Sequence, residues 1–270
     1  MTLKNWIVHQ ERIGRPCFSH AEAAAAFPAL SPNALDAALS RFRATGLLQP
    51  VHRGFYCVVP AHYALAGAVP PYYYIDPLMR WMGRPYYVAL LSAAELWGAS
   101  HQKVPVTQVM TELPPASTSA RKNPSIEWIY RRRVPGAFLA RKNGENGPIV
   151  YSGAELTALD LVRYAGRAGG LSFVATVLAE LAESTDFAGA GDGVFRTAAV
   201  ADVQRLGYLF GAVLGDEARA RVIRDELRRM GAALRTVPLR PGPGGAGAPG
   251  AGVDRTWRVA INEQIEVDEL

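Results

Sequence analysis

The chain has 270 residues, of which 49% are hydrophobic and 20% are charged, and its formal net charge is +5 at pH 7. This composition predicts a soluble globular protein that buries its own core without help from metals or disulfide bonds. The two cysteines exclude a disulfide framework and do not make a zinc site by themselves, and they favour a reducing, cytoplasmic location. Polar residues interrupt the N-terminal segment, and no apolar run reaches the ~18 residues of a membrane span, so we expect neither a signal peptide nor a membrane partner.

Basic side chains are concentrated in two segments. Residues 1–60 hold six lysines and arginines against three acidic residues, and residues 121–142 hold seven against Glu127 alone. Such clusters are typical of proteins that bind a polyanion, but a solvated charged face gives the same pattern. Charge alone therefore leaves both interpretations open.

The chain begins with three predicted helices and one short strand. Apolar residues at helical spacing predict a helix over 3–13, and residues 17–18 predict a very short strand. Ser19 and Glu22 have the spacing of a capping box, which begins the second helix. Ser31, followed by a proline, is the N-cap expected for the third helix.

A β-hairpin is predicted after the third helix, which Gly46 ends. Two strand-like runs at 47–51 and 55–59 flank a turn that contains a glycine. The order helix, short strand, helix, helix, hairpin is that of a winged helix-turn-helix. We therefore predict such a DNA-binding domain over residues 1–62.

The rest of the chain, residues 63–270, predicts a larger mixed α+β domain, so the expected fold class is α+β. A capping box at 152–155 is expected to begin its helical part. The predicted parts are helices at 76–82 and 86–97 and strands at 104–111 and 125–134 within 63–149, a mainly helical part at 150–240, a flexible Gly/Pro loop at 241–252, and a final strand within 253–270 that rejoins the sheet.

The third helix is the candidate DNA-reading element. Leu35, Leu39 and Phe42 form its packed stripe, so the opposite face is left free, and it carries small residues among Asn and Arg. Asn and Arg make paired hydrogen bonds to base edges, a helix N-terminus holds phosphate, and the preceding helix crosses the backbone. The candidate DNA-binding residues are Ser19, His20, Ser31, Asn33, Ser40, Arg41, Arg43, His52 and Arg53.

The second domain adds four basic candidates for contacts to the phosphate backbone, namely Arg121, Lys122, Arg131 and Arg133. If they share a face with the third helix, both domains clasp one DNA half-site. The competing interpretations are a winged helix used for protein contact and arginines that are merely solvated.

Cys17 and Cys57 fall on strands that pair in this fold, so we expect them to lie close together. Buried free thiols are favoured over a redox switch in a cytoplasmic protein.

No motif predicts a cofactor, a metal site or a catalytic residue, so we expect a protein that is not an enzyme. Residues 242–247 match G-x-G-x-x-G, but Pro249 and Gly250 follow where a dinucleotide-binding fold needs a helix. There is no G-x-x-x-x-G-K-[ST] loop and no G-x-S-x-G elbow, and the five histidines lack metal-ligand spacing.

Several stretches resemble the AbiEi antitoxin family over nearly the whole chain. They include HRGFY at 52–56 and GRPYYVALLSAAEL at 83–96, and continue at 98–102, 108–110, 155–162, 169–171, 204–209 and 257–262. The resemblance implies an abortive-infection antitoxin of a type IV toxin–antitoxin system. It further implies that the protein represses its own promoter by binding inverted repeats. A nucleotidyltransferase toxin would be its functional partner, countered by the C-terminal domain without a stable complex.

Two other functions stay open at the level of sequence. A winged helix fused to a nuclease-like domain would need clustered acids and lysines, and residues 104–134 supply only Glu112 and Glu127 without an acid-x-lysine pairing. A stand-alone transcriptional regulator without a toxin partner fits the same sequence. No leucine-rich seam predicts a constitutive dimer, so we expect a monomer off DNA.

Overall fold

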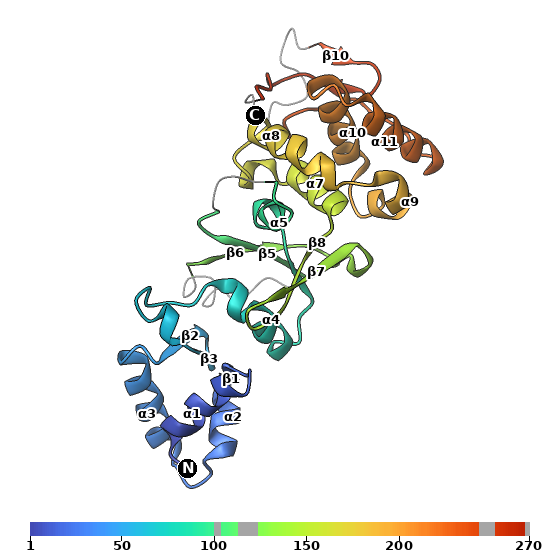
Figure 1. Ribbon diagram of the computed structural model, residues 1–270. Coiled ribbons are helices and arrows are strands. Elements are labelled where there is room, and N and C mark those ends of the chain that lie inside the picture. Colours follow the sequence, from blue (N-terminus) through green and yellow to red (C-terminus); the bar gives the residue numbers. More distant parts are fainter. Residues whose placement is uncertain (100–103, 113–123, 243–251, 268–270) are drawn as a thin grey trace. The chain divides into compact units, whose positions relative to one another are not determined.

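The computed structural model describes residues 1–99, 104–112, 124–242 and 252–267 (Figure 1). The fold is mixed α+β, as predicted, and it divides into two compact units. The first unit comprises Met1–Val88, Pro105–Val134 and Arg141–Val150, and the second comprises Ala89–Val104, Pro135–Ala140 and Tyr151–Leu270. None of the helices in the described ranges is long and apolar enough to cross a membrane.

The first unit starts with a winged helix-turn-helix whose elements follow the predicted order. They are α1 (Leu3–Arg12), β1 (Cys17–Ser19), α2 (His20–Ala26), α3 (Pro32–Ala44), β2 (Leu48–His52) and β3 (Phe55–Val58). The strands form an antiparallel sheet in the order β1-β3-β2. Both helix starts are capped as predicted, because Ser19 and Glu22 form the capping box of α2 and Ser31 caps α3.

This three-stranded sheet is buried on both faces, because alternate residues of a strand point in opposite directions. One face packs against α1, α2 and α3 through a cluster that includes Ile7, Phe18, Leu35, Leu39 and Val58. The other face packs against α4 (Pro71–Trp81) through a cluster that includes Phe55, Cys57, Tyr74, Leu78 and Val109. A 3₁₀ turn, η1 (Ala61–Tyr63), precedes α4. The helix α4 therefore joins the winged helix to the larger sheet of the same unit.

A five-stranded sheet follows, in the order β6-β5-β4-β8-β7 (Figure 1). Its strands are β4 (Tyr86–Val88), β5 (Thr107–Thr111), β6 (Ile126–Tyr130), β7 (Leu139–Gly144) and β8 (Gly147–Ser152). The pair β4 and β5 is antiparallel, and the pair β5 and β6 is parallel. The 3₁₀ turn η2 (Gly136–Phe138) precedes β7.

Three predictions in this region need correction. The helix predicted at 86–97 is the strand β4 followed by α5 (Leu90–Leu96), because a central strand buried on both faces has the continuous apolar run of a buried helix. The helix predicted at 76–82 starts earlier, with Pro71 in its first turn. The strand predicted at 125–134 ends at Tyr130.

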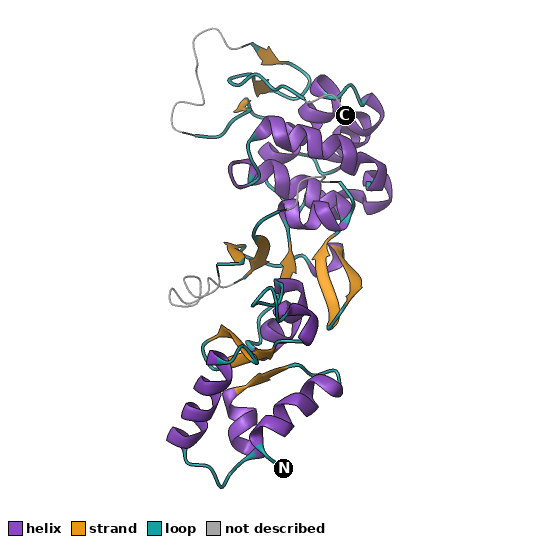
Figure 2. Ribbon diagram, turned by 60° about the vertical axis from the view of Figure 1, so that its left-hand side comes forward, coloured by secondary structure: helices purple, strands orange, loops and turns teal. Residues whose placement is uncertain are grey.

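The second unit is mainly helical from residue 154 on, as predicted (Figure 2). Its helices and turns are α7 (Ala154–Arg163), η3 (Ala165–Arg167), α8 (Leu171–Leu181), η4 (Ala182–Ser184), α9 (Phe187–Phe195), α10 (Val200–Tyr208), the π-helical turn η5 (Leu209–Val213) and α11 (Glu217–Arg229). A small sheet in the order β10-β11-β9 follows. Its strands are β9 (Val237–Pro238), β10 (Val253–Asp254) and β11 (Val259–Ala260).

Two further predictions are wrong in this unit. The final strand does not rejoin the five-stranded sheet, because β11 pairs with β9 and β10. The predicted capping box at 152–155 does not form. Gly153 is the N-cap of α7, Ser152 Oγ bonds to the hydroxyl of Thr157 at 2.6 Å, and Glu155 Oε1 accepts from the backbone N–H of Asp186.

Gly207 of α10 gives a test of the packing around β11. A Cβ atom added there would clash with the ring of Trp257, which is buried and whose carbonyl accepts a hydrogen bond from Gln204 Nε2 at 2.6 Å. Gly→Ala inside a helix normally adds about 0.5–1 kcal/mol of stability. We expect Gly207→Ala to lower the free energy of unfolding instead, by about 1–3 kcal/mol, in urea denaturation. Gly166→Ala is the control, since nothing lies within 4 Å of its Cβ position. A Gly207→Ala protein as stable as the parent would contradict this packing.

Candidate nucleic-acid interface

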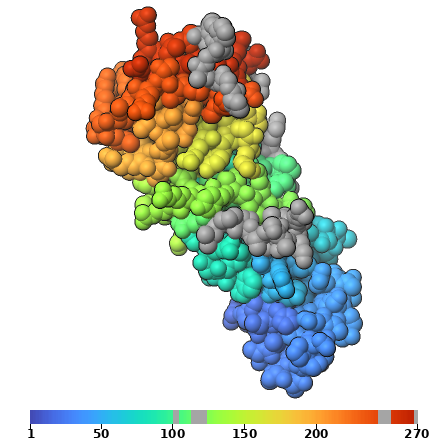
Figure 3. Space-filling model, turned by 180° about the vertical axis from the view of Figure 1, so that it is seen from behind, coloured from blue at the N-terminus to red at the C-terminus, as the bar shows by residue number. Residues whose placement is uncertain are grey.

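The outer face of α3 is open to solvent. Leu35, Ala38 and Leu39 are buried, whereas the residues on the other side of the helix are exposed. These exposed residues are Asn33, Ala37, Ser40, Arg41 and Ala44. The winged helix is the blue part of the surface in Figure 3. The prediction that this face of α3 is left free is confirmed.

The N-terminus of α3 keeps a hydrogen-bond donor available for an anion. Ser31 Oγ accepts from the backbone N–H of Ala34 at 3.3 Å, which leaves its own O–H to donate. Pro32 has no N–H, and Ser31 and Asn33 are exposed. The positive end of the helix dipole also favours an anion here.

His20 ties the start of α2 to the hairpin and to α3. Its backbone N–H donates to Gly54 O at 2.8 Å, and its Nε2 lies 2.8 Å from Asp36 Oδ1. The carboxylate of Asp36 lies exposed on α3, where it would repel phosphate, so its pairing with His20 matters electrostatically. Sequence reasoning missed this pair, because the two residues belong to different helices. The contacts of His20 to Asp36 and Gly54 therefore hold α2, α3 and the hairpin together.

The tip of the hairpin presents one arginine. Arg53 is exposed, and its turn closes through Gly54, whose φ of +74° favours glycine. The neighbouring His52 is half-buried, with its ring against that of Trp81 at 5.6 Å between centroids and its Nδ1 3.2 Å from Arg53 O. Of the two predicted contacts at the tip, only Arg53 extends into solvent.

Arg43 places a positive charge near the hairpin. It is exposed near the C-terminal end of α3. Burial raises the pKa of Tyr56 in β3, and the nearby charge of Arg43 lowers it, which partly offsets that rise. Tyr56 therefore stays a neutral phenol at physiological pH, beside the cation. No sequence pattern indicated this neighbour of the candidate interface.

Two of the predicted DNA contacts, at Ser19 and Arg131, are not available because these side chains are buried. Ser19 is 4% exposed, and its hydroxyl accepts from the backbone N–H of Glu22 and donates to the carboxylate of the same residue, as the cap requires. Arg131 is 8% exposed, and its Nη1 donates to the hydroxyl of Tyr87 at 2.8 Å. Neither side chain can reach a phosphate from these positions.

Of the three remaining basic candidates, only Arg133 lies within the described residues. Arg133 is exposed on the loop that follows β6. Arg121 and Lys122 lie outside the described residues, so their contribution stays a prediction.

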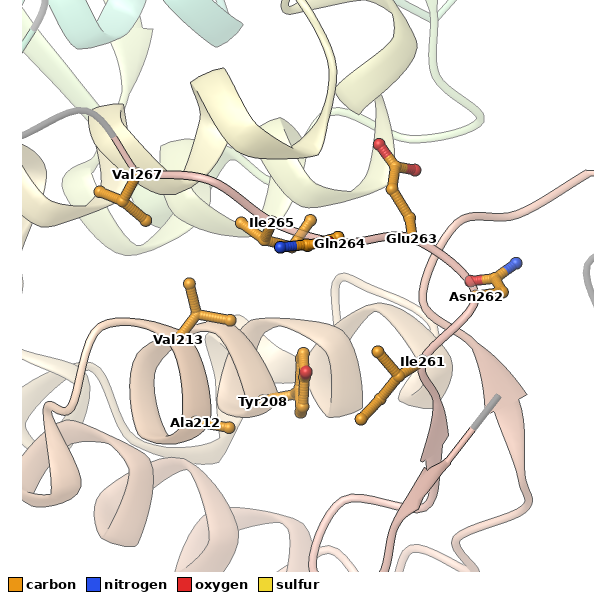
Figure 4. A pocket seen from close by; sticks show the side chains of 9 residues that line it. All are labelled: Tyr208, Ala212, Val213, Ile261, Asn262, Glu263, Gln264, Ile265 and Val267. Atoms are coloured by element: carbon orange, nitrogen blue, oxygen red, sulfur yellow. The ribbon is translucent and has the colours of Figure 1, made fainter. Parts of the chain in front are cut away.

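The second unit contains an open groove of about 740 Å³ along the C-terminal segment (Figure 4). Tyr208, Ala212 and Val213 line one side, and residues 261–265 and Val267 line the other. The carboxylate in this groove, Glu263, forms an ion pair with Arg240, whose Nε lies 3.7 Å from Glu263 Oε2. Across the described ranges, no three His, Cys, Asp or Glu side chains are grouped to hold a metal ion.

Comparison with known proteins relates both the fold and part of the sequence to others. The crystal structure of the RV2827C protein from Mycobacterium tuberculosis is similar to the chain with a TM-score of 0.65 and 14% sequence identity. The similarity covers 94% of this chain and 88% of that one, and at this identity it establishes the fold alone. No curated protein matches the chain.

Residues 87–212 match the family model of the AbiEi antitoxin C-terminal domain. This range begins in β4 and ends in η5, so it covers most of the five-stranded sheet and the helices from α7 to α10, but not α11. The match supports an antitoxin role in an abortive infection system. This match over the C-terminal domain supports the AbiEi antitoxin family, in agreement with the resemblance seen in the sequence.

Proposed function

We propose that the chain is the DNA-binding antitoxin of a type IV toxin–antitoxin system. In this proposal it acts in the cytoplasm, represses its own operon by binding inverted repeats in the promoter, and counters a nucleotidyltransferase toxin without a stable complex. The open face of α3 is the observation that carries the DNA-binding part. The antitoxin part is supported by the family match over residues 87–212.

In the proposed complex, α3 enters the major groove. Asn33 and Arg41 have the side chains that form paired hydrogen bonds with adenine and guanine, and Ala37 and Ser40 let the helix approach closely. The Ser31 end of α3 holds a phosphate, and Arg53 contacts the backbone from the hairpin. Asn33 and Arg41 would then specify sequence, whereas the other contacts would position the protein.

The two carboxylates considered for a nuclease-like site both form hydrogen bonds within the protein. Glu112 Oε1 accepts a hydrogen bond from the backbone N–H of Val134 at 2.9 Å. Glu127 Oε2 accepts from Gln108 Nε2 at 2.9 Å. Both acids hold local structure, so we propose a regulatory protein without catalytic activity. A neighbouring gene for a nucleotidyltransferase would distinguish the antitoxin from a stand-alone regulator.

Base reading by α3 predicts a loss of sequence preference in two variants. Asn33→Ala and Arg41→Ala should each weaken binding to the chain's own promoter by about 1–3 kcal/mol and change binding to random duplex far less. The measurement is the dissociation constant for both duplexes at one fixed salt concentration. Arg221→Ala, which removes an exposed charge on α11, is the matched control. An equal loss on both duplexes would limit these residues to backbone contacts.

The buried Arg131 and the exposed Arg133 form a second matched pair. Arg133→Ala should reduce the slope of log binding constant against log salt by about 0.9, if that residue neutralises one phosphate. Arg131→Met should leave the slope unchanged and lower the free energy of unfolding by about 1–3 kcal/mol, because a buried hydrogen bond to Tyr87 is lost. A shallower slope in the folded Arg131→Met protein would contradict its burial, and an unchanged slope for Arg133→Ala would remove that arginine from the interface.

The two proposed activities should separate. The double variant Asn33→Ala/Arg41→Ala is expected to lose repression of a promoter reporter, while cells that express the cognate toxin are still rescued by it. The physical reason is that both substituted side chains are exposed on α3, far in sequence from the matched domain. Loss of rescue at normal protein levels would mean that toxin neutralisation also depends on α3.

A further inference from the structure

The chain's two cysteines lie directly opposite each other on neighbouring strands. Cys17 of β1 pairs in register with Cys57 of β3, and the two sulfur atoms are 3.3 Å apart. This confirms the expected proximity of the two residues. Both are free thiols in the structure.

The register places this pair at the position in an antiparallel ladder where a disulfide closes most readily. The backbone N–H of Val58 donates to Pro16 O at 2.8 Å, and that of His20 donates to Gly54 O at 2.8 Å. Hydrogen bonds therefore flank the Cys17–Cys57 pair and do not join its own backbone groups. In such non-hydrogen-bonded pairs the Cα atoms are about 4.5 Å apart, which lies within the range found in disulfides.

One of the two thiols is accessible to a small oxidant. Cys17 is half-buried and lines an open cavity of about 510 Å³, together with Arg15, Arg80 and Asn146. The side-chain amide nitrogen of Asn146 lies 3.9 Å from Cys17 Sγ. Cys57 is fully buried behind it, and burial together with the hydrogen bond to Cys17 raises the pKa of the Cys57 thiol. Cys17 is therefore the sulfur that an oxidant meets first.

We propose that this pair is an oxidative modification site at which hydrogen peroxide converts the two thiols into an intrachain disulfide. Peroxide first oxidises Cys17 to a sulfenic acid and releases one water. The sulfur of Cys57 then attacks Cys17 Sγ, the S–S bond forms as the S–O bond breaks, and the hydroxide leaves with the Cys57 proton as a second water. The two thiols lose two electrons in total, and one peroxide is reduced to two waters.

The disulfide would enclose the whole helix-turn-helix. Cys17 and Cys57 are 40 positions apart, and α2, α3 and β2 lie between them. Cys57 belongs to the cluster that faces α4, whereas Phe18 and Val58 belong to the cluster that faces α3. The crosslink therefore lies on the sheet face away from α3. It should restrict the unfolded chain and leave the candidate DNA-reading face unchanged.

The test uses the full-length native protein and does not depend on the proposed function. After treatment with hydrogen peroxide, the intact mass should fall by about 2 Da and return on addition of dithiothreitol. Peptide mapping should join the Cys17 peptide to the Cys57 peptide. The melting temperature should rise by about 4–8 °C.

Cys17→Ser is the matched control, because its substituted side chain is half-exposed and the variant keeps Cys57 in place. It should show neither the mass loss nor the rise in melting temperature. The proposal is overturned if the parent protein instead gains the mass of two or three oxygen atoms on one cysteine, forms only dimers linked between chains, or keeps both thiols reduced.

Discussion

Leu35 and Leu39 of α3 are almost completely buried against a cluster that contains Phe18 and Val58 of the three-stranded sheet. A helix held by one stripe has its rotation about its own axis fixed, because turning it would expose these two leucines and bury polar side chains. That constraint determines which residues α3 turns to solvent. The DNA-binding proposal depends on it, because Asn33 and Arg41 lie opposite the buried stripe.

The strand β3 packs against α3 on one face and against α4 on the other, so it connects the position of α3 to the rest of the first unit. Its alternate residues belong to two clusters, with Val58 facing α3 and Phe55 and Cys57 facing α4. Trp81 of α4 stacks on Phe55 at 5.0 Å between ring centroids. The hairpin therefore has its strands fixed from both sides, and Arg53 is presented on a supported turn.

The parts that sequence predicted well are those set by local interactions. The caps at Ser19 and Ser31 involve residues three positions away, so their spacing was sufficient to locate α2 and α3. The prediction failed where distant contacts decide. Tyr87 lies in a central strand only because β5 and β8 flank it, and the hairpin β7–β8 was missed because its edge strand is polar and exposed. The prediction of a capping box at 152–155 failed because the side chains of Ser152 and Glu155 form hydrogen bonds with other partners.

Arg131 and His20 illustrate the same limit at the candidate site. Ile129 and Arg131 are buried and Tyr130 between them is exposed, so the alternation of β6 continues one residue past its end. Counting by twos from Ile129 would have placed Arg131 inward, whereas its charge alone predicted a surface position. The partner of His20 had no comparable signal, because Asp36 lies on another helix and the contact exists only once both helices pack.

Charge counting connects these corrections to how DNA would be held. With Arg131 buried, Asp36 paired with His20 and Arg41 assigned to base reading, the proposal leaves three exposed candidate arginines for phosphate contacts, namely Arg43, Arg53 and Arg133. Three neutralised phosphates correspond to a salt slope of about −2.7 for one copy, which is small for a protein that recognises duplex DNA. A single copy would thus gain little from non-specific attraction. Affinity for a promoter would then depend on base contacts made by α3 and on occupancy of both halves of an inverted repeat, which is the arrangement expected of an autorepressor that is monomeric off DNA.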